Sequence, residues 1–278
     1  MKNKARIIAA SAACLISLTS CSSKKSDVNK VTGEFSVTFL DVGKADSMIL
    51  RTQDHTVVID CGEKGDGKNI ISELESINVT EIDCLIITHY DQDHVGGAAK
   101  LIKNADIKKV IAPDYSEDNE ETQKYEAALA EMALVPEIIT DTVDFTLDDV
   151  HFTVYPPQRD DYGKNDDNDF SLVTKVVHGS NVLLFTGDAM EMRLNEIMDI
   201  GQCDLLKVPY HGRYVNNLGD FLDKTAPQYA VISTSEKELS EDVTALLDKR
   251  GIASYPTCTC GKITAVSDGT SLAFSTEN

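Results

Sequence analysis

Residues 86–97 read Ile86-Ile87-Thr88-His89-Tyr90-Asp91-Gln92-Asp93-His94-Val95-Gly96-Gly97. The apolar run 84–87 that leads into them is typical of a buried strand, and small residues that favour a helix start follow. Two imidazoles and two carboxylates therefore leave the end of one strand together. Neutral imidazole nitrogens and carboxylate oxygens are good donors for divalent ions, so this spacing indicates a metal site rather than a polar surface loop.

Two other polar side chains also follow apolar runs. Asp188 comes after residues 182–186 and behind Gly187, and His211 comes after residues 205–209. A carboxylate or imidazole at a strand end has free access to a pocket. We therefore expect the three strand-end motifs to converge on one site.

The order His89-x-Asp91-x-Asp93-His94 is similar to the signature His-x-His-x-Asp-His of the metallo-β-lactamase superfamily, with Asp91 where the second His usually is. The chain more closely resembles the metallo-β-lactamase-like domain of the competence protein ComEC family, including its stand-alone relatives. Three further motifs carry that resemblance, in order: Phe39-Leu40-Asp41-Val42-Gly43, Thr186-Gly187-Asp188-Ala189 and Lys207-Val208-Pro209-Tyr210-His211-Gly212. The resemblance covers about residues 34–270 and implies an α+β fold, an αββα sandwich of the metallo-β-lactamase type. The sequence pattern alone indicates only mixed α and β structure with short strands.

The resemblance also implies the metal ligands. One complete metal site would comprise Asp93, His94, Asp188 and His211, with Asp188 bridging two ions. A second site would use His89, Asp91 and Asp188. Asp93 and His89 are the residues expected to act directly in catalysis.

The usual third His of the second site has no clear counterpart. His151 and His178 match by residue type alone, and we expect both to face solvent. Competence-type members have an Asn/Ser segment here, so Asn168 is the candidate ligand or substrate contact. Asp60 is expected to accept hydrogen bonds from the ligands rather than bind metal. Asp41 and Asp46 flank a Gly-containing turn, where carboxylates often satisfy only backbone donors.

One or two divalent ions, Mn²⁺ or Zn²⁺, would make this a metal-assisted hydrolase. Two ions about 3.5 to 4 Å apart can hold a bridging water and stabilise negative charge on the attacked centre. Asp91 in place of a His adds a hard oxygen ligand, which favours Mn²⁺ over a zinc site suited to lactams. The sequence offers no rival nucleophile motif such as Gly-x-Ser-x-Gly.

The N-terminus resembles a bacterial lipoprotein signal. Lys2, Lys4 and Arg6 precede an apolar stretch, and Leu18-Thr19-Ser20-Cys21 resembles a lipobox. We expect a signal peptide over 1–20, a disordered tether over 21–33 that is lipidated on Cys21, and a metallo-β-lactamase-like domain over 34–278. This predicts a lipoprotein on the extracytoplasmic face of the cell membrane. An ordinary signal peptide cleaved after Ser20 is the alternative.

The chain carries a formal net charge of −20, which becomes −23 once the three cationic residues of the signal are removed. Such a field repels a nucleic-acid backbone, although bound ions would invert the potential locally. The leading interpretation is a phosphodiester hydrolase acting on a nucleic acid or a nucleotide, with no protein partner predicted. The alternatives are an amide or lactam hydrolase on the same site and a non-enzymatic surface binding protein.

The remaining pattern predicts alternating strands and helices. Residues 117–132 are expected to form an amphipathic helix, and residues 156–170 a solvated loop that contributes nothing to a core. Cys61, Cys84 and Cys203 are expected to be buried thiols. The role of Cys258 and Cys260 stays open.

Overall fold

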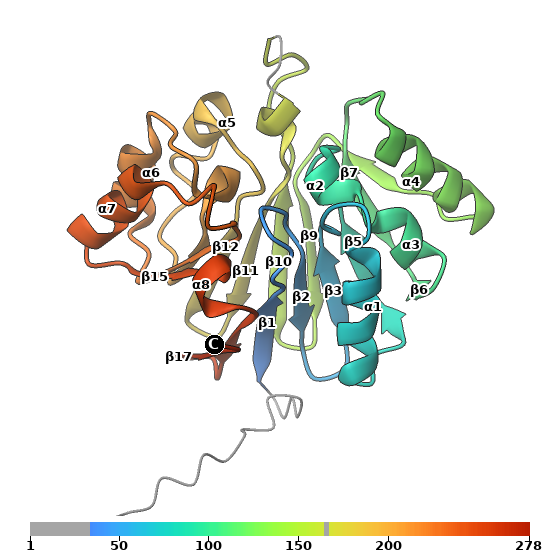
Figure 1. Ribbon diagram of the computed structural model, residues 1–278, viewed down its shortest axis with the longest axis horizontal. Coiled ribbons are helices and arrows are strands. Elements are labelled where there is room, and N and C mark those ends of the chain that lie inside the picture. Colours follow the sequence, from blue (N-terminus) through green and yellow to red (C-terminus); the bar gives the residue numbers. More distant parts are fainter. Residues whose placement is uncertain (1–33, 164–166) are drawn as a thin grey trace, which may run out of the picture. The chain divides into compact units, whose positions relative to one another are not determined.

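Two β-sheets pack face to face (Figure 1). Buried side chains from both sheets form one core between them. The structure is a computed structural model that describes residues 34–163 and 167–278. In the described residues the larger sheet has eight strands in the order β17-β16-β1-β2-β3-β5-β7-β8. These strands are β1 (Phe35–Phe39), β2 (Met48–Arg51), β3 (Thr56–Ile59), β5 (Cys84–Ile86), β7 (Val110–Pro113), β8 (Glu137–Ile139), β16 (Ile263–Ser267) and β17 (Leu272–Thr276). The pairs from β3 to β8 are parallel, and the others are antiparallel.

The smaller sheet has seven strands in the order β15-β14-β13-β12-β11-β10-β9. They are β9 (Val143–Leu147), β10 (Val150–Tyr155), β11 (Val173–His178), β12 (Asn181–Phe185), β13 (Leu205–Lys207), β14 (Tyr229–Ile232) and β15 (Ala253–Pro256). Strands β12 to β15 are parallel to one another. A separate parallel pair joins β4 (Glu81–Ile82) to β6 (Asp106–Ile107).

Helices cover the outer face of each sheet (Figure 1). The larger sheet carries α1 (Gly67–Ser76), α2 (Gln92–Val95), α3 (Ala98–Ile102) and α4 (Glu120–Glu131). The smaller sheet carries α5 (Glu191–Glu196), α6 (Leu218–Thr225) and α7 (Glu241–Lys249), and α8 (Thr257–Cys260) follows β15. Two short 3₁₀ turns, η1 (Asp167–Phe170) and η2 (Pro209–Gly212), complete the described structure. This layering confirms the predicted α+β fold, an αββα sandwich.

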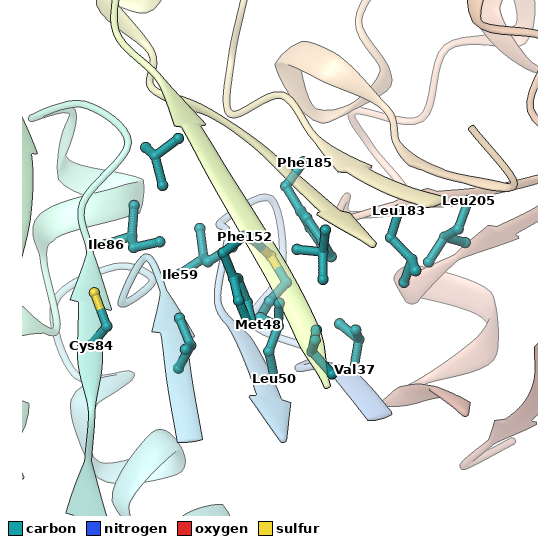
Figure 2. Packing of buried hydrophobic residues seen from close by; sticks show 14 of the residues in the cluster. Val37, Met48, Leu50, Ile59, Cys84, Ile86, Phe152, Leu183, Phe185 and Leu205 are labelled. Carbon is teal, nitrogen blue, oxygen red and sulfur yellow. The ribbon is translucent and has the colours of Figure 1, made fainter. Parts of the chain in front are cut away.

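The core between the sheets is made of aliphatic and aromatic side chains. Figure 2 shows Ile59 and Ile86 of the larger sheet, and Phe152 and Phe185 of the smaller one, within this buried cluster. Burial of each such side chain contributes about 1.5–3 kcal/mol, so this layer holds the two sheets together. The strand ends above it are thereby brought close to one another.

Helix α4 begins at residue 120 rather than at the predicted 117. The side chain of Asn119 accepts a hydrogen bond from Thr122 N at 2.8 Å and caps the helix there. Strands β9 and β15 are hard to recognise in the sequence. Both are edge strands with few buried residues, so their sequences lack a strong apolar signal.

The prediction that residues 156–170 contribute nothing to a core was wrong. Tyr162 is 2% exposed, its ring meets Phe170 edge to face at 4.9 Å, and its hydroxyl donates to Glu196. One aromatic residue within an acidic loop is enough to anchor that loop on α5. The predicted burial of Cys61, Cys84 and Cys203 is confirmed, and burial raises the pKa of the Cys84 thiol to about 12.

The predicted signal peptide, Cys21 and the tether over 21–33 lie outside the described residues. Within residues 34–163 and 167–278, no helix combines the length and the apolar character needed to cross a bilayer.

Candidate metal centre

The candidate ligands lie at strand ends on one edge of the sandwich. Strand β5 leads into residues 88–94, Asp188 follows β12, and His211 lies in η2 just after β13. These strands are parallel members of their two sheets, so their carboxyl ends open towards the same region. The motifs that contain His94, Asp188 and His211 meet in this region.

The backbone around His211 is strained in a way that aims its ring inward. Tyr210 and His211 both have φ of 52°, and Gly212 has φ of 72°. A left-handed conformation costs a non-glycine residue about 1–2 kcal/mol, and such strain is typical of functional sites. Gly212 is required in addition because a Cβ there would lie 2.5 Å from Ile232 Cγ2.

Two imidazoles and a carboxylate face one another at the centre. His94 Nε2 and His211 Nε2 are 3.3 Å apart, and Asp188 lies 3.4 Å from the first and 2.9 Å from the second. The opposite nitrogens are already engaged, since His94 Nδ1 donates to Asp60 at 2.8 Å and His211 Nδ1 to Ser233 O at 3.1 Å. Both rings therefore present Nε2 lone pairs to the same point, as metal-binding histidines do.

The electrostatics of this group favour a cation. Burial works against a charge on His211, but the carboxylates of Asp188, Asp93 and Asp46 outweigh it and raise its pKa to about 9. Burial likewise opposes a charge on His94, but Asp188 and Asp60 raise the pKa of His94 well above its usual value. Burial opposes the charged form of Asp188, yet the two histidines and Lys207 hold its pKa well below the usual range.

Asp46 belongs to this group, and the sequence reasoning missed it. One donor atom from each of Asp46, His94, Asp188 and His211 lies within 4.8 Å of every other, and all four residues are buried. Asp46 was expected to satisfy backbone donors in a glycine turn; instead it is fully buried against Lys207. Asp46 precedes strand β2, whereas Asp188 follows β12, so the search for polar residues after apolar runs did not find it.

Asp93 lies at the mouth of the group. Its Oδ2 is 3.5 Å from His211 Nε2 and accepts a hydrogen bond from Lys44 at 2.9 Å. Burial raises the pKa of Asp93, but His211 and His94 reverse this effect and hold it well below its usual range. A cavity of about 340 Å³ opens beside Asp93 and is lined by Lys44, Glu63, Lys64, Gln92, Asp93, Glu120 and Glu121.

His89 and Asp91 form an adjoining pair. His89 Nε2 lies 3.6 Å from Asp91 Oδ2, and the His89 ring centroid is 4.0 Å from that of His94. Within the described part of the chain, the buried Nε2 of His89 has no hydrogen-bond partner. Its Nδ1 lies 3.1 Å from the Thr88 hydroxyl and 3.4 Å from that of Ser171.

No histidine completes the His89 side among the described residues. The hydroxyls of Thr88 and Ser171 both approach His89 Nδ1, and that of Ser171 also accepts from Asp188 N at 3.0 Å. Asn168 lies in η1 with a buried Oδ1 that has no hydrogen-bond partner in the described structure, while its amide nitrogen is 3.7 Å from Met190 Sδ. The role of Asn168 as a metal ligand stays a prediction.

The two other histidine candidates lie elsewhere. His151 is exposed on β10 and contacts Thr146 and Asp144. His178 was expected to face solvent, and this was wrong, because it is 3% exposed. Its Nδ1 is 2.8 Å from Ser267 Oγ in the other sheet, so the sandwich covers a residue that looked like part of an open turn.

Asp60 and Asp41 differ sharply in environment. Asp60 is fully buried and accepts hydrogen bonds from Thr88 N and from the Thr88 hydroxyl, at 2.8 and 2.7 Å, besides that from His94. Asp41 is exposed and accepts a hydrogen bond from Gly43 N at 3.5 Å. Asp60 thus orients a metal-type ligand, whereas Asp41 belongs to a surface turn.

The donor set fits a divalent ion. Two imidazole nitrogens that point at one another would repel each other without a cation or a proton between them, and the buried Nε2 of His89 lacks a partner in the described residues. Nitrogen and carboxylate donors in this mixture suit Zn²⁺ or Mn²⁺. We take His94, Asp188 and His211 as the centre of the site.

Comparison with known proteins agrees with this geometry. Residues 40–236 match the family described as the metallo-beta-lactamase superfamily. The chain is 28% identical over 229 residues to ComE operon protein 3 of Bacillus subtilis (strain 168), a match that covers 74% of this chain and 29% of that protein. It is 30% identical over 213 residues to Competence protein ComA of Neisseria gonorrhoeae, covering 72% and 27% respectively. The chain thus spans less than a third of the length of these curated relatives.

A solved structure shares the fold. The metallo-beta-lactamase fold protein YhfI from Bacillus subtilis is 10% identical, with a TM-score of 0.56, and the match covers 80% of this chain and 95% of that one. At this identity the similarity concerns the fold alone.

Proposed function

The chain belongs to the metallo-beta-lactamase superfamily, and on that premise we propose that it is a metal-dependent hydrolase of phosphodiesters, tethered to the extracytoplasmic face of the cell membrane. The observation that carries the proposal is the convergence of His94 Nε2, His211 Nε2 and Asp188 within 3.4 Å of one another. This group is built to hold a divalent ion, and His89 and Asp91 adjoin it.

A divalent ion held by His94, Asp188 and His211 would supply an acidified water and would stabilise negative charge on the attacked centre. The residues of the chain orient that chemistry. Asp60 and the Ser233 carbonyl hold the Nδ1 protons of His94 and His211, which keeps both Nε2 atoms directed inward. Lys44 places a cation beside Asp93 at the mouth, where an anionic substrate would enter.

Two features support a phosphodiester rather than a lactam as the substrate. Asp91 adds a carboxylate where the superfamily signature has a His, and oxygen ligands favour harder ions such as Mn²⁺. ComE operon protein 3 and Competence protein ComA are similar to this chain over 74% and 72% of its length. A role in transport does not follow, because the chain corresponds to only part of those relatives.

The charge of the chain supports a small substrate. A net charge of −20 repels a long polyanion, and the cavity beside Asp93 holds about 340 Å³, which suits a ligand of modest size. We therefore propose a nucleotide or a short diester rather than long nucleic acid. The membrane tether is proposed on the sequence Leu18-Thr19-Ser20-Cys21 alone, through a lipid on Cys21.

The test is hydrolysis of bis-p-nitrophenyl phosphate by the purified protein with added Mn²⁺ or Zn²⁺. We expect activity that is stronger with Mn²⁺ and is lost in His89→Ala and in His211→Ala. His151→Ala is the matched control, because His151 is an exposed histidine of the same domain that touches none of the candidate ligands. It should keep wild-type activity.

A parallel assay with a chromogenic cephalosporin separates the alternatives. Cleavage of the cephalosporin without diester hydrolysis would assign the site to lactams or amides. If neither substrate is hydrolysed with Mn²⁺ or with Zn²⁺ although metal is bound, the result would favour a binding protein that retains the fold.

A further inference from the structure

Lys207 is a lysine with no contact to water. It ends β13 inside the run Leu205–Lys207, all three residues of which are buried, and its side chain is 0% exposed. Lysine is almost never fully buried unless it is paired, because removal of an ammonium from water costs several kcal/mol. The residues around it must therefore explain its position.

The Lys207 ammonium lies in a cage of oxygen atoms. It pairs with Asp46, donates to Gly187 O at 3.0 Å, and lies 3.5 Å from Asp188 Oδ1. Its own carbonyl accepts from the Thr186 hydroxyl at 2.8 Å, which fixes the strand beside the cage. Carboxylate and carbonyl oxygens are the donors that hard metal cations prefer, so the ammonium occupies a place suited to an ion.

Asp46 lies on the wrong side of the imidazoles to share their metal. Its oxygens are 3.7 Å from His211 Nδ1 and 3.9 Å from His94 Nδ1. These Nδ1 atoms already donate to Ser233 O and Asp60, whereas the Nε2 atoms face Asp188 on the other side of the rings. Asp46 is therefore close to the two histidines without lying on the side where they would bind a metal ion.

We propose that the Lys207 ammonium is a resident cation of the metal centre: it occupies the oxygen cage in place of a metal ion, neutralises Asp46, and holds the Asp188 carboxylate for an ion bound at His94 and His211. Asp46 is then the counter-ion of Lys207 and not a metal ligand. Lys207 is a positioning residue, because it touches Asp188 and never the substrate.

The proposal concerns which residues bind metal and is independent of the substrate. Its test is the number of Mn²⁺ ions per chain after equilibrium dialysis, measured by elemental analysis, so failure of the proposed hydrolysis would leave the result readable. Asp46→Asn should bind the same number of ions as the wild type. Lys207→Ala empties the cage and leaves Asp46 unpaired, so it should bind one ion more per chain.

Two further variants bracket this result. The double variant Asp46→Asn/Lys207→Ala should return to the wild-type number, because the cage then lacks its carboxylate. Lys175→Ala is the matched control: Lys175 lies on β11 of the same sheet, and its ammonium donates to Ile200 O at 2.9 Å, away from the cage. It should match the wild type.

Loss of the tightly bound ion in Asp46→Asn would overturn the proposal by making Asp46 a ligand. An unchanged or lower ion count in a folded Lys207→Ala would overturn it as well. If Lys207→Ala does not fold, a crystal structure of the wild type grown with Mn²⁺ decides the question by anomalous scattering. We expect no ion at coordination distance from Asp46, and an ion bound to that carboxylate would refute the inference.

Discussion

Substitution of Asp60 would show how much this residue contributes to the candidate metal centre. Its fully buried carboxylate accepts hydrogen bonds from Thr88 N, the Thr88 hydroxyl and His94 Nδ1, at 2.8, 2.7 and 2.8 Å. In Asp60→Ala the Thr88 hydroxyl can turn to His89 Nδ1, 3.1 Å away, but the other two donors are left without an acceptor. Each unsatisfied buried donor costs about 1–3 kcal/mol, so we expect a loss of about 2–6 kcal/mol in the free energy of unfolding.

A loss of that size is a large share of the roughly 5–15 kcal/mol that stabilises a typical domain. The same substitution frees the His94 ring to rotate. Removal of the partner that orients a metal-binding histidine typically lowers metal affinity by about 10–100-fold, and we expect a decrease in that range.

Asp60→Asn is the matched control. Asp60 has φ of 58°, a conformation that Asn tolerates, and the amide oxygen can still accept from Thr88 N. The amide nitrogen, however, would face His94 Nδ1, so donor meets donor. We expect a smaller stability loss of about 1–3 kcal/mol with a comparable loss of metal affinity.

Urea unfolding of the metal-free proteins, followed by circular dichroism, measures the free energy of unfolding. Competition with a chromogenic chelator measures the metal affinity. The reasoning fails if Asp60→Ala unfolds within about 1 kcal/mol of the wild type, or if both variants bind metal as tightly as the wild type does.

Three more outcomes follow from the site and from the N-terminus. Asp188→Ala removes the carboxylate shared by His94 and His211, so elemental analysis should find at least one tightly bound ion fewer than in the wild type, and equal content would contradict the site. In the metal-free protein His211 has its pKa raised to about 9 and stays protonated below that value, so a metal must displace a proton. Apparent metal affinity should therefore rise by about tenfold per pH unit for each displaced proton as the pH approaches 9, and a pH-independent affinity between pH 6 and 9 would argue against a protonated His211. Cys21→Ser should release the protein from the membrane fraction or leave its precursor uncleaved, whereas unchanged membrane association with normal cleavage would exclude lipidation.

Part of this site could be predicted from the sequence because its signals are local. A polar residue directly after an apolar strand lies at the edge of a sheet, whatever the strand pairs with. That rule led us to expect Asp188 and His211 at one edge, and the structure places both beside His94. The ordered motifs predicted the sandwich through their resemblance to a known family. Periodicity predicted an amphipathic helix over 117–132, and the structure has α4 there with Tyr125 and Leu129 buried one turn apart.

Other features were not predictable, because they depend on contacts between distant parts of the chain. His178 looked exposed in its turn but is covered by Ser267 of the opposite sheet. Tyr162 looked like part of a solvated loop but is anchored on α5 through Glu196. No local pattern indicates either contact, since the packing of one sheet or helix against a distant segment creates it.

The sequence by itself determined which residue types stand at which strand ends, and hence that histidines and carboxylates gather in a candidate metal centre. Tertiary structure alone decided the pairing of Asp46, in the turn before β2 of the larger sheet, with Lys207, at the end of β13 in the smaller one. Periodicity indicates whether a side chain faces inward. It did not predict that Lys207, in a strand, or Asp46, in a turn, belongs to the site. Their charges become tolerable in the interior only where the two sheets meet, because each provides the counter-ion that water would otherwise supply.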